Sequence, residues 1–217
     1  MAKEATEYKA IYKKSTGTEI TVGVRPFIQI PNGTEGVKFL ADVTSSHDHL
    51  RRHTRQFFIK RSNELPGCPE TQHGAILEKY KWLKENGFPV PPTYRYDSQN
   101  REFLITDMTQ FGEIYDKTNP LRKTMKNMDQ VIEEIKIIAK KTFHDGNGVF
   151  LGLDAYSIIV DSKNNGHIYL LDLGRGAYRL HDGVDEKGRT KLPQNAEAIA
   201  QAFIDRILTT QKPASLG

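Results

Sequence analysis

Residues 168–174 read Ile-Tyr-Leu-Leu-Asp-Leu-Gly, an apolar run that ends in a carboxylate followed by a leucine and a glycine. The run has the length and composition of a short buried strand, so we expect Asp172 to lie directly at the end of that strand. An ionised carboxylate beside a buried strand is costly unless a cation or hydrogen-bond donors stabilise it. The sequence therefore predicts a partner for Asp172, and a cation would account for its position.

A second apolar segment upstream predicts that this strand belongs to a hairpin. Residues 158–160 are Ile-Ile-Val, and residues 161–166 have the composition of a turn. The tight stretch before them, residues 151–157, carries a single carboxylate, that of Asp154. We therefore expect Asp154 near the start of the hairpin and Asp172 at its end.

The first half of the chain predicts an antiparallel meander, then a helix, then a hairpin. The helix is expected over residues 69–86, because apolar residues recur there at helical spacing, while Pro69 suits its start and Gly87 its stop. Residues 1–24 show no clear period and are expected to form a peripheral strand or a loose arm. The expected strands are 26–31, 37–43, 56–60, 93–96 and 102–106.

The second half predicts two further helices, at residues 127–143 and 195–208, after a polar linker. In the first of them Asn127 suits the N-cap, and apolar residues recur at helical spacing. A helix that packs on a core accounts for this pattern without any function. Its expected buried face comprises Val131, Ile135, Ile138 and Thr142, flanked by Ile132, Ala139 and Phe143.

The composition is typical of a soluble globular protein. The chain has 217 residues, a net charge of +4 and one cysteine, Cys68, which excludes an internal disulfide framework and a cysteine-rich zinc site. No apolar run is long enough to span a membrane and the N-terminus is unlike a signal peptide, so we expect a cytoplasmic protein without a membrane partner. The basic stretch at residues 47–61 fits a solvated loop, an acidic partner or nucleic acid.

The order of these elements, together with several short motifs, resembles the protein-kinase-like fold in the compact form of small bacterial, archaeal and viral members. The resemblance covers residues 26–208. It implies a two-lobed α+β fold, with a five-stranded antiparallel N-lobe and one helix in residues 1–108, and a reduced, mainly helical C-lobe in residues 109–217. It also implies a cleft that holds ATP with Mg²⁺. Some kinases delivered into host cells have similarly small C-lobes, which leaves a host cell as a second expected location.

The resemblance assigns the phosphate-holding residues to the N-lobe. The segment 32–37, Asn-Gly-Thr-Glu-Gly-Val, is similar to a glycine-rich loop in which Gly33 and Gly36 let backbone amides approach phosphate oxygens. Lys60 resembles the strand lysine that contacts the α- and β-phosphates, and Glu78 resembles its partner on the helix. Taken singly, the glycine segment also fits an ordinary turn, and the two charged residues also fit an exposed surface.

The resemblance assigns the other site residues to the connection between the lobes and to the C-lobe. The segment that ends in Asp107 and Met108 is similar to the stretch whose backbone binds the adenine edge. Asp172 begins an Asp-Leu-Gly sequence that resembles the metal-binding Asp-Phe-Gly motif, which implies that it binds Mg²⁺. Asp154 is then the candidate acceptor for the substrate hydroxyl, and Ser157 stands where the family has a metal-binding asparagine. This loop departs from the family, because it is shorter and lacks the usual histidine.

Three functions fit these features. The first is an ATP-dependent phosphotransferase, an atypical minimal kinase that acts on a protein hydroxyl, although a sugar or a small metabolite would suit the same residues. The irregular loop at residues 152–157 also fits a catalytically impaired pseudokinase that binds a nucleotide or a partner. The basic stretch at residues 47–61 fits a nucleic-acid-binding domain, whose binding would depend on salt.

Overall fold

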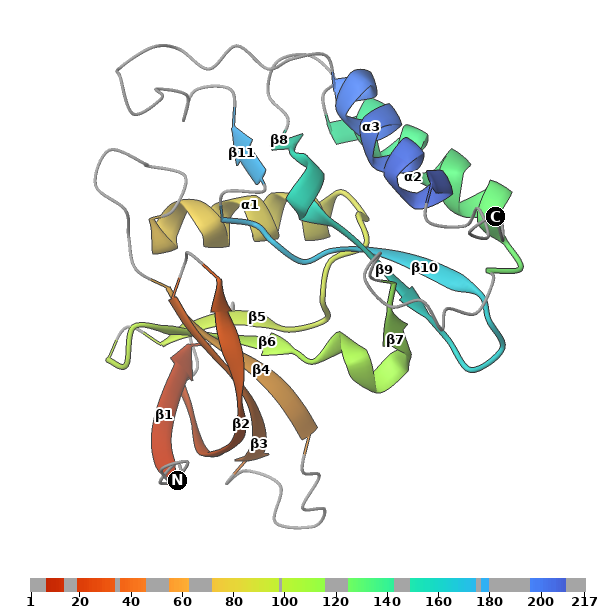
Figure 1. The fold of residues 1–217 in the computed structure, drawn as a ribbon. Helices are drawn as coiled ribbons and strands as arrows, with labels where there is room; N and C mark the ends of the chain where they lie inside the picture. The colour runs from red at the N-terminus through yellow and green to blue at the C-terminus, as the bar shows by residue number, and fades with distance from the viewer. Residues whose placement is uncertain are drawn as a thin grey trace. The chain divides into compact units, whose positions relative to one another are not determined.

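The computed structural model describes residues 7–13, 19–33, 36–45, 55–62, 72–97, 99–115, 125–142, 149–174, 177–179 and 196–209. Within those residues the protein is an α+β structure with three α-helices and antiparallel sheets (Figure 1). The chain divides into two compact units, Met1–Glu64 with Pro91–Gln110, and Leu65–Val90 with Phe111–Gly217. One junction lies close to the predicted boundary after residue 108, but helix α1 (His73–Glu85), expected beside the N-terminal sheet, belongs to the second unit.

The first unit is built around a six-stranded sheet in the order β1-β2-β3-β4-β6-β5, in which every pair of neighbours is antiparallel. The two edge strands, β1 and β5, also contact each other, so the sheet curls round an interior. Its strands are β1 (Tyr8–Lys13), β2 (Glu19–Gly33), β3 (Gly36–Ser45), β4 (Arg55–Ser62), β5 (Tyr94–Asp97) and β6 (Glu102–Thr106).

The prediction of five strands was wrong by one, because residues 8–13 form β1, the peripheral strand that was one of two alternatives for residues 1–24, and β2 begins earlier than expected. Strand β1 pairs antiparallel with the start of β2, with Tyr8 opposite Val24 and Lys13 opposite Glu19. The charged residues of this segment lie among small or β-branched ones, and that mixture hides the alternation of a strand. The structure nevertheless buries Ala10 and Val24, so the alternation is present but weak.

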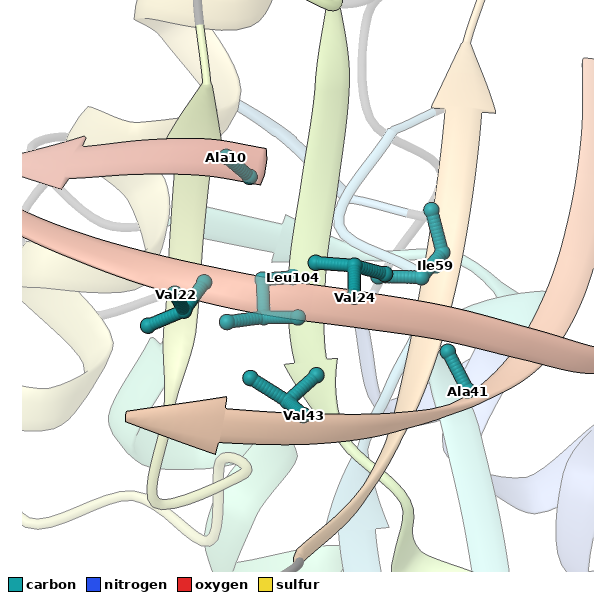
Figure 2. Packing of buried hydrophobic residues seen from close by; sticks show 7 residues of the cluster. All are labelled: Ala10, Val22, Val24, Ala41, Val43, Ile59 and Leu104. Atoms are coloured by element: carbon teal, nitrogen blue, oxygen red, sulfur yellow. The ribbon is translucent and has the colours of Figure 1, made fainter. Parts of the chain in front are cut away.

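The core of the first unit lies inside the curled sheet. Small and branched apolar side chains from β1, β2, β3, β4 and β6 pack together there (Figure 2). Small residues suit the interior of a tightly curled sheet because opposing strands approach each other closely. The cluster consists of Ala10, Val22, Val24, Ala41, Val43, Ile59 and Leu104, with Tyr8 packed against it.

The second unit contains the three helices and two small antiparallel sheets. One sheet has the order β10-β9-β7, and in the other β11 pairs with β8 and also contacts α1. Across the described residues, every helix is too short or too polar to serve as a membrane span. The remaining elements are β7 (Glu113–Ile114), α2 (Met128–Thr142), β8 (Val149–Leu151), the 3₁₀ turn η4 (Leu153–Ala155), β9 (Tyr156–Val160), β10 (Gly166–Leu170), β11 (Ala177–Arg179) and α3 (Ala196–Thr209).

Helices α2 and α3 pack on each other, and α2 also contacts β10 (Figure 1). The predicted buried face of α2 is confirmed at Val131, Ile135, Ile138 and Thr142. Asn127 precedes the helix and its carbonyl accepts the Val131 N–H, but its side chain pairs with the backbone of Gly166 at the start of β10. The Asn127 side chain therefore links α2 to the β9–β10 hairpin and does not cap the helix.

Helix α1 ends where the sequence predicted, because Gly87 adopts φ +74°, a conformation that favours glycine. Ile76, Tyr80 and Leu83 are buried, as expected for the apolar stripe, whereas Leu77, expected in the same stripe, is only half-buried. The face contains one residue that the sequence analysis did not single out, Lys79, whose side chain is 0% exposed.

Candidate functional site

The candidate site residues fall in both compact units. Gly33, Gly36, Lys60 and the Asp107–Met108 pair belong to the first unit. Those of the second unit are Glu78, Asp154, Ser157 and Asp172. The expected contact between Lys60 and Glu78 would join the two units, and it stays a prediction.

Lys60 lies on β4 and is 6% exposed. Its neighbour Ile59 points into the core of the curled sheet, and successive strand residues point to opposite faces, so Lys60 lies on the other face. On that face it is paired in register with Phe103 of β6, which is 0% exposed. The rings of Tyr94 and Tyr96 pack on Phe103, with centroids 5.3 and 5.0 Å away. Lys60 therefore lies beside a buried aromatic cluster, a surface that suits the apolar stem of a lysine.

In the glycine segment, Gly33 ends β2 and Gly36 begins β3. Gly33 pairs with Gly36, and the residues between them lie outside the described part of the chain. In the neighbouring pair of strands Gly36 is opposite Ser62, while Lys60 is opposite Lys38. The glycine turn and Lys60 are therefore near the same end of the sheet, as a phosphate-holding loop and its lysine would need to be.

The Asp107–Met108 segment leaves the other end of β6. The Asp107 carboxylate accepts hydrogen bonds from the Thr109 N–H at 3.0 Å and the Thr109 hydroxyl at 2.7 Å, which organises the 3₁₀ turn that starts at Met108. The Gln110 side-chain amide donates to the Asp107 carbonyl at 2.6 Å. Along β6, Asp107 lies about 13 Å beyond Phe103, the cross-strand neighbour of Lys60, at about 3.3 Å per residue. This order along the sheet is the order of adenine and phosphates along a nucleotide.

In the second unit the Asp172 turn is fixed by its own backbone and by α1. Asp172 is half-buried, and its Oδ1 accepts the N–H of Gly174 at 3.2 Å. Leu173 is 0% exposed and anchors the turn in the core. The Lys79 ammonium donates a hydrogen bond to the Gly174 carbonyl at 3.3 Å. The turn after β10 is therefore held on both sides of Gly174.

Two backbone hydrogen bonds tie the end of β10 to other candidate segments. The Leu171 N–H donates to the Ala155 carbonyl at 3.1 Å, which brings η4, and with it Asp154, to the exit of β10. The Leu170 N–H donates to the Pro89 carbonyl at 2.8 Å, which ties the same strand end to the chain that follows α1. The open end of the β9–β10 hairpin is thus where η4, β10 and the chain around α1 converge.

Asp154 and Ser157 both lie at this open end. Asp154 sits on η4 and is exposed, so its carboxylate is accessible to a substrate. Ser157 is half-buried on β9 and pairs in register with Tyr169 of β10. The hairpin therefore brings Asp154, Ser157 and Asp172 to one end of a single substructure, as the sequence predicted for the two carboxylates.

Glu78 and Lys79 have opposite environments on α1. The Glu78 side chain is exposed, whereas that of Lys79 is buried in the face that carries Ile76 and Leu83. The helical spacing contained this information, because residue 79 lies three positions after 76 and four before 83. A lysine inside an apolar stripe is therefore the sequence feature that indicates a buried charge on α1.

The described residues contain no group of three or more His, Cys, Asp or Glu side chains placed to hold a metal ion. A protein cage of that kind is not what Mg²⁺ requires, since the ion is usually bound by one or two carboxylates together with phosphates and water. The half-buried Asp172, in a turn held by the hydrogen bonds of Gly174, could supply one such carboxylate. The predicted basic loop lies largely outside the described residues, because 46–54 are not among them.

Compared with known protein families, the sequence matches none, and no curated protein sequence matches it either. Its function must therefore be inferred from its own residues.

Proposed function

We propose that this chain is an ATP-dependent phosphotransferase of the protein-kinase-like type, an atypical minimal kinase that acts on a hydroxyl group, with a protein hydroxyl as the first substrate class to test. The observation that carries the proposal is the open end of the β9–β10 hairpin. There the hydrogen bond from the Leu171 N–H to the Ala155 carbonyl joins the neighbours of Asp172 and Asp154, so both aspartates lie at the same end of the hairpin. Two carboxylates in these positions suit a metal-holding and a substrate-orienting role.

The proposed division of labour follows the environments of the residues. Asp172, with Ser157 as a second oxygen ligand, would hold Mg²⁺, and the ion would neutralise charge on the phosphates when it is bound. The exposed Asp154 would accept the proton of the attacking hydroxyl. In the first unit, Lys60 and the backbone at Gly33 and Gly36 would hold the phosphates.

The order of the elements along the chain supports this reading. A meander of strands leads to Lys60, a helix follows, and a hairpin then ends at Asp107 and Met108. Along β4 and β6 the glycine turn, Lys60 and the Asp107 segment occur in that order. An adenine at Asp107 and phosphates near Lys60 would fit this sequence of groups. The sixth strand, β1, is an addition at the edge and leaves that order intact.

A second function, nucleotide binding without catalysis, is favoured by two specific observations. Ser157 stands where an amide ligand is expected, and Glu78, the expected partner of Lys60, is exposed. A hydroxyl is a weaker metal ligand than an amide carbonyl, which would reduce metal affinity or spoil its geometry. A pseudokinase of this kind would bind ATP yet transfer no phosphoryl group.

Phosphoryl transfer from γ-labelled ATP separates the two functions. Self-labelling and labelling of a mixture of protein acceptors would be compared for wild type, Asp154→Asn and the matched exposed carboxylate Asp205→Asn on α3. Loss of a general base lowers rates by about 100-fold or more, so Asp154→Asn should lose its label and Asp205→Asn should keep it. Label of equal intensity in all three proteins would contradict the assigned role of Asp154. Nucleotide binding with no label in wild type would favour the pseudokinase.

A further inference from the structure

Lys79 is a charged group in the core of the second unit that the proposed function does not use. Its side chain is 0% exposed, and it belongs to the face of α1 that also buries Ile76, Tyr80 and Leu83. An ammonium withdrawn from water costs several kcal/mol unless acceptors replace the lost hydration, roughly as for any buried ion. An apolar residue would fill this position of an apolar stripe without that cost. The lysine therefore has a task that its packing alone does not explain.

One acceptor of Lys79, the Gly174 carbonyl, points to that task. Its Nζ donates to the carbonyl of Gly174, 95 residues further along the chain. The N–H of the same glycine donates to Oδ1 of Asp172. Gly174 is thus held from both sides, by the ammonium at its carbonyl and by the carboxylate at its amide.

These two hydrogen bonds matter because the residue that they hold, Gly174, is a glycine. Glycine has the widest conformational freedom of any residue, so the turn that follows Leu173 would be loose if only its own backbone restrained it. The hydrogen bond from Lys79 limits rotation about Gly174, and the direction of the Gly174 N–H follows from that rotation. The N–H in turn orients the Asp172 carboxylate.

We propose that Lys79 is a positioning residue, which fixes Gly174 and thereby orients the Asp172 carboxylate for a divalent cation. The part that concerns the cation rests on the proposed function, whereas the restraint on the turn is independent of it. Groups that orient a metal ligand without touching the metal usually change metal affinity by about 10- to 100-fold when they are removed.

The test compares Lys79→Met with Lys81→Met. Methionine has a similar length and suits an apolar site, and Lys81 is a matched control because it lies on the same helix with a 74% exposed side chain. ATP affinity would be measured by calorimetry with Mn²⁺ and again with EDTA, and the ratio of the two dissociation constants gives the contribution of the metal. Hydrogen exchange at the Gly174 amide would be followed in the same proteins.

Lys79→Met should lower the metal's contribution by about tenfold, leave ATP binding in EDTA unchanged, and speed exchange at the Gly174 amide. Lys81→Met should change none of these quantities. An unchanged metal contribution in Lys79→Met would overturn the proposal, and so would an equal loss of binding with Mn²⁺ and with EDTA, because that result indicates a general structural defect. If Lys79→Met does not fold, Lys79→Leu, which also lacks a donor, replaces it under the same criteria.

Failure of the proposed function is recognisable separately. A wild-type protein that binds ATP no better with Mn²⁺ than with EDTA would contradict the metal role of Asp172 and, with it, the orientation of that carboxylate for a cation. The exchange rate of the Gly174 amide in Lys79→Met would still test whether Lys79 restrains Gly174. Faster exchange than in wild type supports this restraint, and an unchanged rate overturns it.

Discussion

The β9–β10 hairpin is held at both ends, and the two ends are held differently (Figure 1). At the turn the contacts are mostly local, since the Asp161 carboxylate accepts the N–H groups of Lys163 and Asn165 and contacts His167. The more distant Asn127 adds two hydrogen bonds to the backbone of Gly166. These groups therefore satisfy one another's hydrogen bonds.

At the open end the contacts come from distant parts of the chain. Pro89 and Ala155 accept the N–H groups of Leu170 and Leu171, and Lys79 donates to Gly174. Candidate chemical groups lie here, in Asp154 and Asp172. One hairpin therefore has a turn held mainly by its own residues and an open end held by other segments, where the candidate residues Asp154 and Asp172 lie. Substitutions at the two ends should therefore have separable effects.

Gly166→Ala is expected to lower stability at the turn end, and more than the other substitutions proposed for the hairpin. A Cβ at this position would lie 2.4 Å from Sδ of the buried Met125 and 3.1 Å from Cγ2 of Val131. The methionine must move within a packed core, which costs about 1–3 kcal/mol of unfolding free energy. Denaturant unfolding would measure this loss of unfolding free energy. We expect nucleotide binding of the folded variant to be unchanged.

The control for this substitution is Gly74→Ala in α1. A Cβ there meets nothing within 4 Å, so helix propensity alone should stabilise the protein by about 0.5–1 kcal/mol. Equal effects of the two substitutions would contradict the packing at Gly166. Loss of nucleotide binding in folded Gly166→Ala would contradict the expectation that the turn end affects stability without affecting nucleotide binding.

Asp161→Asn is expected to have a smaller effect, and one that depends on pH. The N–H of Asn165 first, and then the His167 side chain, lower the pKa of Asp161 below its usual value. A carboxylate whose pKa is lowered by folding adds stability above its unfolded pKa of about 3.9 and loses it as the pH falls towards the folded value. The melting temperature of Asp161→Asn should therefore lie below that of wild type at pH 6, and the gap should narrow at pH 3. A gap of the same size at both pH values would show that the charge is not the cause.

The sequence predicted best those elements whose pattern is simple. The apolar periodicity of α2 gave its buried face, and the apolar runs around residues 161–166 gave the hairpin together with the places of Asp154 and Asp172. Both rest on local patterns that burial reinforces.

The sequence failed where pairing over a distance decides the structure. Strand β11 consists of Ala177–Arg179 and exists because it pairs with β8, which no local pattern in a polar segment reveals. The pattern of residues 1–24 did not decide between a strand and a loose arm, because lysines interrupt the alternation of β1. The burial of Lys79 depends on contacts with distant residues such as Gly174, whose carbonyl accepts its hydrogen bond from 95 residues away. Tertiary contacts overrode local preference in each case.

The most direct test of the account is calorimetric binding of ATP with Mg²⁺ to wild type and to two matched variants of the same hairpin, Asp172→Asn at the open end and Asp161→Asn at the turn. We predict that wild type and Asp161→Asn bind equally well, and that Asp172→Asn binds at least about tenfold more weakly when Mg²⁺ is present. Absence of binding in wild type, or the same affinity in all three proteins, would contradict a nucleotide-and-metal site at Asp172.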